Sequence, residues 1–156
     1  GMGAHRMNVP KELAEYKLER AEIVVYLPAD WNISDHEEKN YWPLRWLKIL
    51  ARLPLEEDSW LGWGHSVPNG KPFAENTQLS SVLLINPENV EEGAAVCLLP
   101  NGEEVNFYQM IPLYEEEVNF KIQNGAETLL GKMGEISAVV DIHRLNVCEG
   151  FGRPKE

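Results

Sequence analysis

Short hydrophobic runs that end at turn-forming residues predict β-strands in several places along the chain. The first, Glu22–Leu27, is rich in β-branched and aromatic residues and ends at Pro28, which indicates a buried strand. The other runs that we expect to form strands are Leu79–Ile85, Ala94–Leu99, Glu104–Leu113 and, near the end of the chain, Ser137–Ile142.

The strongest local pattern is Asn101-Gly102, which stands between two of these runs. Asn-Gly favours the tight turn of a β-hairpin because both residues tolerate positive φ, so we predict that 94–99 and 104–113 pair. Residues 104–113 also alternate as a strand does, with Val105, Phe107, Gln109 and Ile111 on one face and Asn106, Tyr108 and Met110 on the other.

Apolar residues at helical spacing predict an amphipathic helix over roughly 36–53. The segment Ser34-Asp35-His36-Glu37 resembles a capping box at the start of this helix, and Pro54 is expected to end it. A short N-terminal helix is expected after Pro10, because proline suits the first position of a helix.

Two further helices are expected after the central strands. The first covers Tyr114–Asn124, and the acids Glu115–Glu117 in its first turn complement the helix dipole and are expected to be solvated. The second covers Ala126–Lys132, whereas the many turn formers within 60–78 predict a structured loop. Strands cluster in the middle and helices flank them, which predicts an α+β fold: a single domain with a central, mostly antiparallel or mixed β-sheet.

The composition fits one compact globular domain. The chain has 156 residues, of which 44% are hydrophobic and 25% are charged, and these proportions exclude wholesale disorder. No apolar run approaches the length of a membrane span, and the N-terminus lacks the apolar core of a signal peptide. Gly1 resembles an expression-tag remnant, so we expect 1–8 to be a tag remnant or flexible N-terminus, 9–148 the domain and 149–156 a tail.

The two cysteines give no metal or redox motif. Cys97 lies in an apolar run and is expected to be a small buried hydrophobe, and Cys148 is far from it in sequence. Neither belongs to a Cys-x-x-Cys pair or has a histidine at ligand spacing, so we expect no metal and no cofactor. With the missing signal peptide, this pattern indicates a reducing compartment and therefore the cytoplasm.

The net charge of −11 is concentrated in the middle of the chain. Residues 53–120 contain 12 acids and one base, Lys71, whereas the rest of the chain holds 13 acids and 13 bases. The charge of this region disfavours binding of a nucleic-acid backbone, since it would add repulsion where cations are needed. Solubility, acids at helix starts and loop edges, and a docking face for a basic partner all remain explanations of the charge.

All five tryptophans lie between residues 31 and 63. Trp42 and Trp46 are one helical turn apart and are expected in the core. Trp31, Trp60 and Trp63 stand in segments dense in turn formers, where they either plug the structure or form a binding surface.

His65 is the one histidine in an informative setting, between Gly64 and Ser66. It either hydrogen-bonds the backbone of its own loop or belongs to a small-ligand or hydrolase site with Asp30 and Tyr114. The sequence contains no nucleophile-elbow motif and no phosphate-binding loop, so no catalytic constellation is visible.

Several of these segments together resemble the suppressor-of-fused-like family. The similarity runs over roughly residues 20–146 in the expected order. It rests on Tyr26-Leu27-Pro28-Ala29-Asp30-Trp31, Trp42-Pro43-Leu44, Leu50-Ala51-Arg52, the loop from Trp60 to Pro68 with Gly64-His65-Ser66-Val67-Pro68, Gln109–Glu117, Phe120-Lys121, Gly125-Ala126 and Leu129-Leu130, with Asp141 and Arg144 fitting the closing segment.

The resemblance implies a non-enzymatic, protein-binding domain equivalent to the N-lobe of the suppressor of fused type. Eukaryotic relatives resemble two-lobed regulators that sequester a transcription factor, and this chain has room for one lobe. Single-domain members resemble bacterial proteins, many of them immunity proteins that neutralise toxins. An acidic chain suits that role, because it complements a basic toxin surface and steers the encounter.

We therefore expect a protein partner, for which a basic toxin domain is one candidate, and neither nucleic acid nor a membrane; the oligomeric state stays open. The alternatives are the small-ligand-binding or hydrolase site at His65 and, from the aromatic residues alone, a scaffold or homodimer. The residues expected to form the binding surface are Asp30, Trp31, Trp60, Trp63, His65, Ser66, Tyr108, Tyr114 and Glu115.

Overall fold

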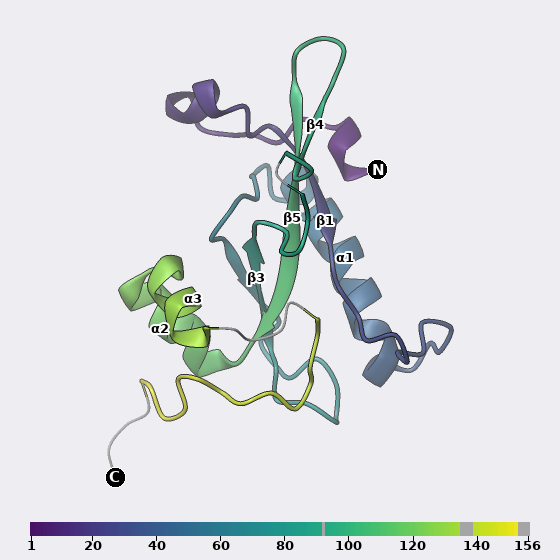
Figure 1. Cartoon of the computed structure of the whole chain (residues 1–156), viewed down its shortest axis with the longest axis vertical. Coiled ribbons are helices and arrows are strands. Elements are labelled where there is room, and N and C mark those ends of the chain that lie inside the picture. The colour runs from purple at the N-terminus through teal and green to yellow at the C-terminus, as the bar shows by residue number, and fades with distance from the viewer. Residues whose placement is uncertain (92, 135–138, 153–156) are drawn as a thin grey trace. The chain divides into compact units, whose positions relative to one another are not determined.

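A computed structural model describes residues 1–91, 93–134 and 139–152 (Figure 1). In chain order it contains two 3₁₀ helices, Met2–Ala4 and Lys11–Tyr16, followed by β1 (Arg20–Val24), α1 (Glu38–Glu56), β2 (Ser66–Pro68), β3 (Ser81–Ile85), β4 (Val96–Leu98), β5 (Glu104–Leu113), α2 (Glu115–Asn124) and α3 (Ala126–Met133).

The five strands form one mixed sheet in the order β1-β5-β3-β2, and β4 pairs with β5 outside that path. β1 runs parallel to β5, with Ala21 opposite Asn106. The pairs β2–β3 and β4–β5 are antiparallel. The predicted α+β class with a mixed sheet is therefore confirmed.

The contacts between residues group the chain into two compact units, and α1, β3 and β5 each contribute residues to both. Unit 1 consists of Gly1–Val25, Pro43–His65 and Leu84–Met110, and unit 2 consists of Tyr26–Trp42, Ser66–Leu83 and Ile111–Glu156.

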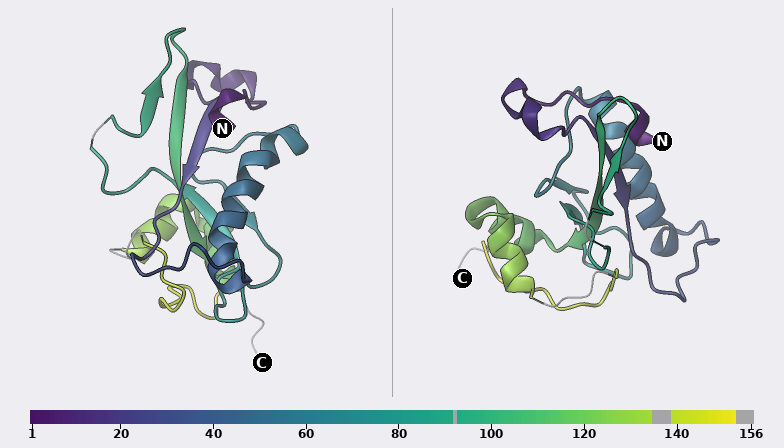
Figure 2. Two further views of the ribbon diagram at one scale, coloured as in Figure 1. Left: turned by 90° about the vertical axis from the view of Figure 1, so that its right-hand side faces the viewer. Right: turned by 45° about the horizontal axis from the view of Figure 1, so that its top comes forward.

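The hairpin predicted from Asn101-Gly102 is present in unit 1 as β4 and β5, with Cys97 opposite Val105. Gly102 has φ +85°, the left-handed conformation that favours glycine in a turn. The expected burial of Cys97 is wrong, because all three residues of β4 are exposed. β5 is the only strand beside β4 in the described part of the chain, as the left view of Figure 2 shows, so an apolar run here forms an exposed edge.

Two predicted strands differ from the structure. β1 begins at Arg20 and ends at Val24, and only Ala21 is fully buried, because β1 lies at an edge of the sheet. Of the strand expected at 137–142, residues 137 and 138 lie outside the described residues, and Val139 forms a single parallel bridge with Tyr26.

α1 does not end before Pro54 as predicted. Pro54 is buried and continues the stripe of Trp42, Trp46 and Leu50 at intervals of four residues, and the helix runs on to Glu56. The start also differs, because α1 begins at Glu38; the carboxylate of Asp35 accepts the backbone N–H of Glu37, just before the helix, at 3.0 Å.

The expected short helix after Pro10 is the 3₁₀ helix Lys11–Tyr16. The N-terminal residues that precede it also have fixed contacts within unit 1. Met7 is buried and donates its backbone N–H to Glu19 at 2.7 Å.

The buried residues of the sheet come mainly from β3 and from 108–113 of β5. Every residue of both segments is buried, so the alternation read from the sequence of β5 does not separate a buried face from an exposed one there. A strand that is covered on both faces tolerates few accessible side chains, and the candidate sites therefore lie in the loops and at the ends of elements.

Candidate functional site

The site begins where β5 passes directly into α2 in unit 2. Tyr114 is the N-cap of α2, and its backbone N–H donates to Oε1 of Glu117 at 2.8 Å. Gly125, with φ +92°, ends the helix at the predicted position. The sequence folds this way because an acid at the third helical position satisfies the free backbone donor at the helix start.

The prediction that Glu115–Glu117 form a solvated helix start is wrong for two of the three residues. Glu117 is fully buried and Glu116 is 9% exposed. Arg144 explains the burial of Glu117, because its guanidinium donates to both carboxylate oxygens, from Nη1 at 2.7 Å and from Nη2 at 2.5 Å. A buried carboxylate needs such a partner, and a two-point arginine pair supplies charge and geometry together.

The same two residues fasten the segment after residue 143 to α2. Oε2 of Glu117 accepts the backbone N–H of Val147 at 3.1 Å. Nη2 of Arg144 also donates to the carbonyl oxygen of Pro112 at 2.9 Å, and the hydroxyl of Tyr114 donates to the carbonyl oxygen of Arg144 at 2.5 Å. The Arg144 guanidinium lies over the Tyr114 ring, 5.0 Å from its centroid.

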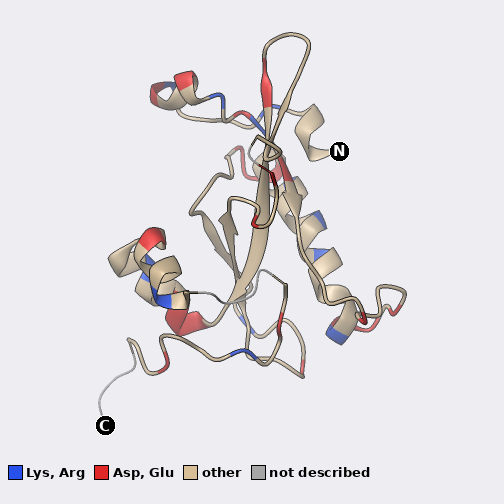
Figure 3. Ribbon diagram, in the orientation of Figure 1, with Lys and Arg blue, Asp and Glu red and all other residues tan. Residues whose placement is uncertain are grey.

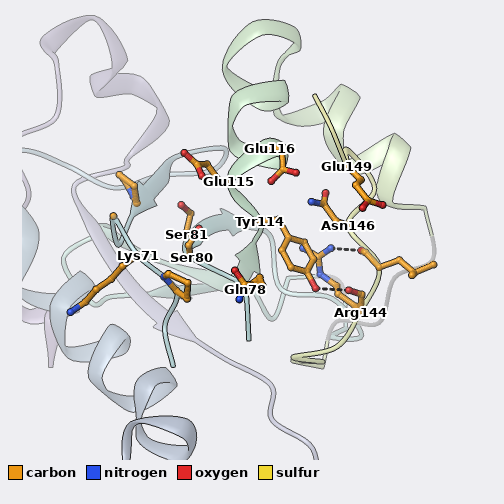
Figure 4. A pocket seen from close by; sticks show the side chains of 14 residues that line it. Lys71, Gln78, Ser80, Ser81, Tyr114, Glu115, Glu116, Arg144, Asn146 and Glu149 are labelled. Atoms are coloured by element: carbon orange, nitrogen blue, oxygen red, sulfur yellow. Dashed lines mark hydrogen bonds between the residues drawn. The ribbon is translucent and has the colours of Figure 1, made fainter. Parts of the chain in front are cut away.

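This fastened segment forms one wall of a groove of about 550 Å³ that lies wholly in unit 2 (Figure 4). The other walls are the loop and strand residues between Pro68 and Ser81 and the start of α2. The side chains that line the groove and carry polar or charged groups are Lys71, Gln78, Ser80, Ser81, Tyr114, Glu115, Glu116, Arg144, Asn146 and Glu149.

The accessible charges of the groove are mostly negative. Glu115 and Glu149 are exposed, and the red first turn of α2 is visible in Figure 3. Lys71 is the exposed cation of the lining, because Arg144 is only 8% exposed and pairs with Glu117. Leu145, 84% exposed, adds an apolar contact at the rim, so the groove offers carboxylates, amides and one aliphatic side chain.

Burial shifts the pKa of two groups near the start of α2 and within it, Tyr114 and Lys121. Burial raises the pKa of Tyr114, and the positive charge of Arg144 opposes that shift in part. The phenol therefore stays protonated at neutral pH and donates its hydrogen bond. Burial lowers the pKa of Lys121, whose Nζ donates to Oγ of Ser66 at 3.1 Å.

Of the five residues of unit 2 predicted from the sequence, Tyr114 and Glu115 line the groove. Ser66 contacts Lys121 instead, and Asp30 is exposed. Trp31 lines a different cavity of about 310 Å³, and its Nε1 donates to the carbonyl oxygen of Asn40 at 2.8 Å. The structure thus brings together only part of the predicted surface in this unit.

The other four predicted residues belong to unit 1. The Trp60 and His65 rings meet edge to face at 4.4 Å between centroids, and Nδ1 of His65 accepts the backbone N–H of Gly62 at 3.1 Å. Trp63 is 40% exposed, whereas Tyr108 is 4% exposed and is a core residue. Burial raises the pKa of Tyr108, and its ring forms no exposed surface.

Sequence reasoning missed most of the groove because its polar residues come from three separated segments. Lys71, Gln78, Asn146 and Glu149 stand in loops without a motif. Arg144 carried the one available signal, since it stood in the closing segment of the family resemblance, but that signal gave no role for it.

Neither a metal centre nor a membrane span is found in the parts of the chain that the structure describes. Residues 1–91, 93–134 and 139–152 contain no group of three or more His, Cys, Asp or Glu placed to hold a metal ion. Within the same ranges, none of the helices has the length and apolar character needed to cross a bilayer.

Comparisons with known proteins find similarity to suppressor of fused proteins, both in a family model and in solved structures. Residues 1–145 match the family model described as suppressor of fused protein. An uncharacterized protein of Ureaplasma parvum serovar 3 is 28% identical over 145 residues, which cover 92% of this chain and 69% of that protein.

Three solved structures share the fold over 69% of this chain. The crystal structure of the Sufu–Fu complex has a TM-score of 0.57 at 16% identity, and Drosophila suppressor of fused has 0.57 at 14%. A homologue from Neisseria gonorrhoeae has a TM-score of 0.56 at 22% identity. The matched part spans 46%, 25% and 57% of those three chains, respectively.

Proposed function

Because the chain belongs to the suppressor of fused protein family, we propose that it is a non-enzymatic protein-binding domain that uses the groove of unit 2. One structure of similar fold is that of a complex, between Sufu and Fu, which supports protein binding as the role of this fold. We carry that role to this chain as a proposal, since the matched part spans less than half of that chain.

The observation that carries the proposal is the way in which Glu117 and Arg144 build the groove. Their buried pair neutralises Arg144, one of the two cations of the lining, and fixes the wall on which Glu149 stands. The accessible charges that remain are the carboxylates of Glu115 and Glu149 opposite the single exposed amine of Lys71. A preformed acidic groove favours a partner that presents lysine or arginine side chains.

The hydrogen bonds that the candidate catalytic groups make support a non-enzymatic role. The hydroxyl of Tyr114 donates to a backbone carbonyl, and Nδ1 of His65 accepts a backbone N–H of its own loop. Both contacts are of the kind that position a loop rather than activate a nucleophile. We therefore propose protein binding in preference to the hydrolase or small-ligand site at His65.

The specific partner that we propose is a basic toxin domain, which makes the chain a bacterial immunity protein acting in the cytoplasm. The net charge of −11 supports this proposal, because an acidic inhibitor is drawn to a basic nuclease-like surface and covers it. Residues 53–120 carry a net charge of −11, so the excess of negative charge comes from this part of the chain.

Co-expression with toxin domains encoded beside the gene tests the proposal. The expected result is that one such domain is retained on the tagged chain at moderate salt and that host growth is restored. If none is retained and none is encoded nearby, the immunity role is wrong. Retention of a partner without toxicity would leave protein binding in place and replace the toxin by another basic protein.

A further inference from the structure

The outer edge of the β4–β5 hairpin, in unit 1, carries backbone groups that face away from the sheet. The backbone hydrogen bonds from Phe107 to Ala95 and from Leu99 to Glu103 are both 2.8 Å long. In an antiparallel ladder, hydrogen-bonded and non-hydrogen-bonded pairs alternate. The N–H and C=O groups of Leu98 therefore point away from β5.

β5 is the only pairing partner of β4 among the described residues. Val96 still uses its N–H locally, in a 3.4 Å contact with the carbonyl of Gly93, but its carbonyl faces the same open side as Leu98. The left view of Figure 2 shows β4 beside β5, on the side away from β1. An edge of this kind is a template on which another strand can pair.

The side chains of this edge are apolar and exposed. Val96 is 40% exposed and Leu98 is 69% exposed. They are two residues apart in a strand and therefore lie on one face of the hairpin. A chain that leaves both the backbone and the apolar side chains of one edge open has the features that strand addition uses.

The charge around the edge determines what kind of strand fits. From Glu88 to Glu104 the sequence contains five glutamates and no lysine or arginine. Glu103 is already paired, since Arg6 and Arg20 donate to its carboxylate. Of the described acids, Glu91 and Glu104 repel a second copy of the same edge and attract a strand that carries basic residues.

We propose that β4 is a docking edge for an extended basic strand of a partner protein, which adds to the sheet next to Leu98. The partner strand alternates apolar residues, which contact Val96 and Leu98, with lysine or arginine residues, which are attracted by the carboxylates of Glu91 and Glu104. This surface belongs to unit 1 and stands independently of the groove proposed in unit 2.

Nuclear magnetic resonance of the full chain tests this proposal, with a blocked synthetic peptide of about seven alternating lysine and valine residues as the probe. The expected result is a shift of the Leu98 amide signal on titration and a slowing of its hydrogen exchange by about tenfold, whereas a matched glutamate–valine peptide has neither effect. Equal effects of the two peptides, or shifts that leave Leu98 unmoved, would overturn the proposal.

Two variants separate backbone pairing from charge. Leu98→Pro removes an outward N–H without removing a ladder bond to β5, so it is expected to weaken peptide binding by about tenfold while the hairpin signals persist. Glu91→Lys does not affect the hydrogen bonds between β4 and β5. It is expected to weaken binding of the lysine–valine peptide and to strengthen binding of the glutamate–valine peptide. Unchanged binding in both variants, or a concentration-dependent dimer that forms through β4 without peptide, contradicts the proposal.

Discussion

The carboxylate of Glu117 and the guanidinium of Arg144, 27 residues apart in the sequence, form a two-point ion pair in the interior of unit 2. The exposed fractions of the two side chains are 0% and 8%. This pair joins the start of α2 to the segment that carries the outer wall of the groove, so fold stability and site geometry depend on the same contact.

Removing one partner of this pair is expected to be costly. Arg144→Met leaves a buried carboxylate without a counter-ion, which costs about 3–5 kcal/mol in the free energy of unfolding. Urea denaturation measures this, with Lys39→Met, in an exposed pair with Glu37, as the control that leaves the midpoint unchanged. The double variant Glu117→Met with Arg144→Met is expected to lose less than the sum of the singles; an additive loss would show that the pair is not coupled.

Stability at low pH is expected to depend on Glu103. Hydrogen bonds from Arg6, and next from Arg20, lower the pKa of Glu103 from 4.5 to about 2. A lowered carboxyl pKa contributes stability that is fully present above pH 4.5 and is lost as the pH falls from 4.5 through 2. Urea midpoints across this range should fall less steeply in Glu103→Gln than in the wild type, and identical slopes would contradict the assignment.

Two exposed glycines are expected to respond to alanine in opposite directions. A Cβ at either Gly102 or Gly131 meets no atom within 4 Å, so sterics with neighbours do not decide the outcome. Gly102 has φ +85°, and Gly102→Ala is expected to cost about 1 kcal/mol through backbone strain. Gly131 lies inside α3, where alanine is expected to stabilise by about 0.8 kcal/mol. Thermal melts of both variants test this. A change of the melting temperature in the same direction in both would contradict the prediction.

Trp42 is buried with its Nε1 donor unpaired among the described residues, and its ring stacks on Phe73 at 4.5 Å between centroids. Trp42→Phe keeps an aromatic ring and removes the unpaired donor, so we expect a loss within about 1.5 kcal/mol. Trp42→Ala leaves a cavity and is expected to cost about 3–5 kcal/mol. Chemical denaturation distinguishes the two, and similar losses would mean that the donor is not unpaired in solution.

Local patterns were sufficient to predict the elements whose cause is local. Asn101-Gly102 located the hairpin, and the interval from Tyr114 to Gly125 gave the bounds of α2, because turn geometry and helix ends depend on neighbouring residues. The family resemblance covered the loop that holds His65 and the closing segment that holds Arg144.

The features that could not be predicted from the sequence depend on contacts between residues far apart in the chain. The three acids at the start of α2 looked alike, and only the arrival of Arg144 distinguishes the buried Glu117 from the exposed Glu115. Apolar composition suggested a buried Cys97, but burial depends on whether another element covers β4. The groove combines three segments, and no pattern within one of them indicates the other two.

The most direct test of protein binding through the groove is the affinity of the partner retained in co-expression for immobilised wild-type and variant chains. We predict that Glu115→Lys with Glu149→Lys weakens binding by about tenfold or more, because it reverses both exposed carboxylates of the lining. The matched control, Glu12→Lys with Glu15→Lys, changes net charge equally on the N-terminal 3₁₀ helix and is predicted to retain most of the wild-type affinity. Equal affinities of the two double variants would contradict the account.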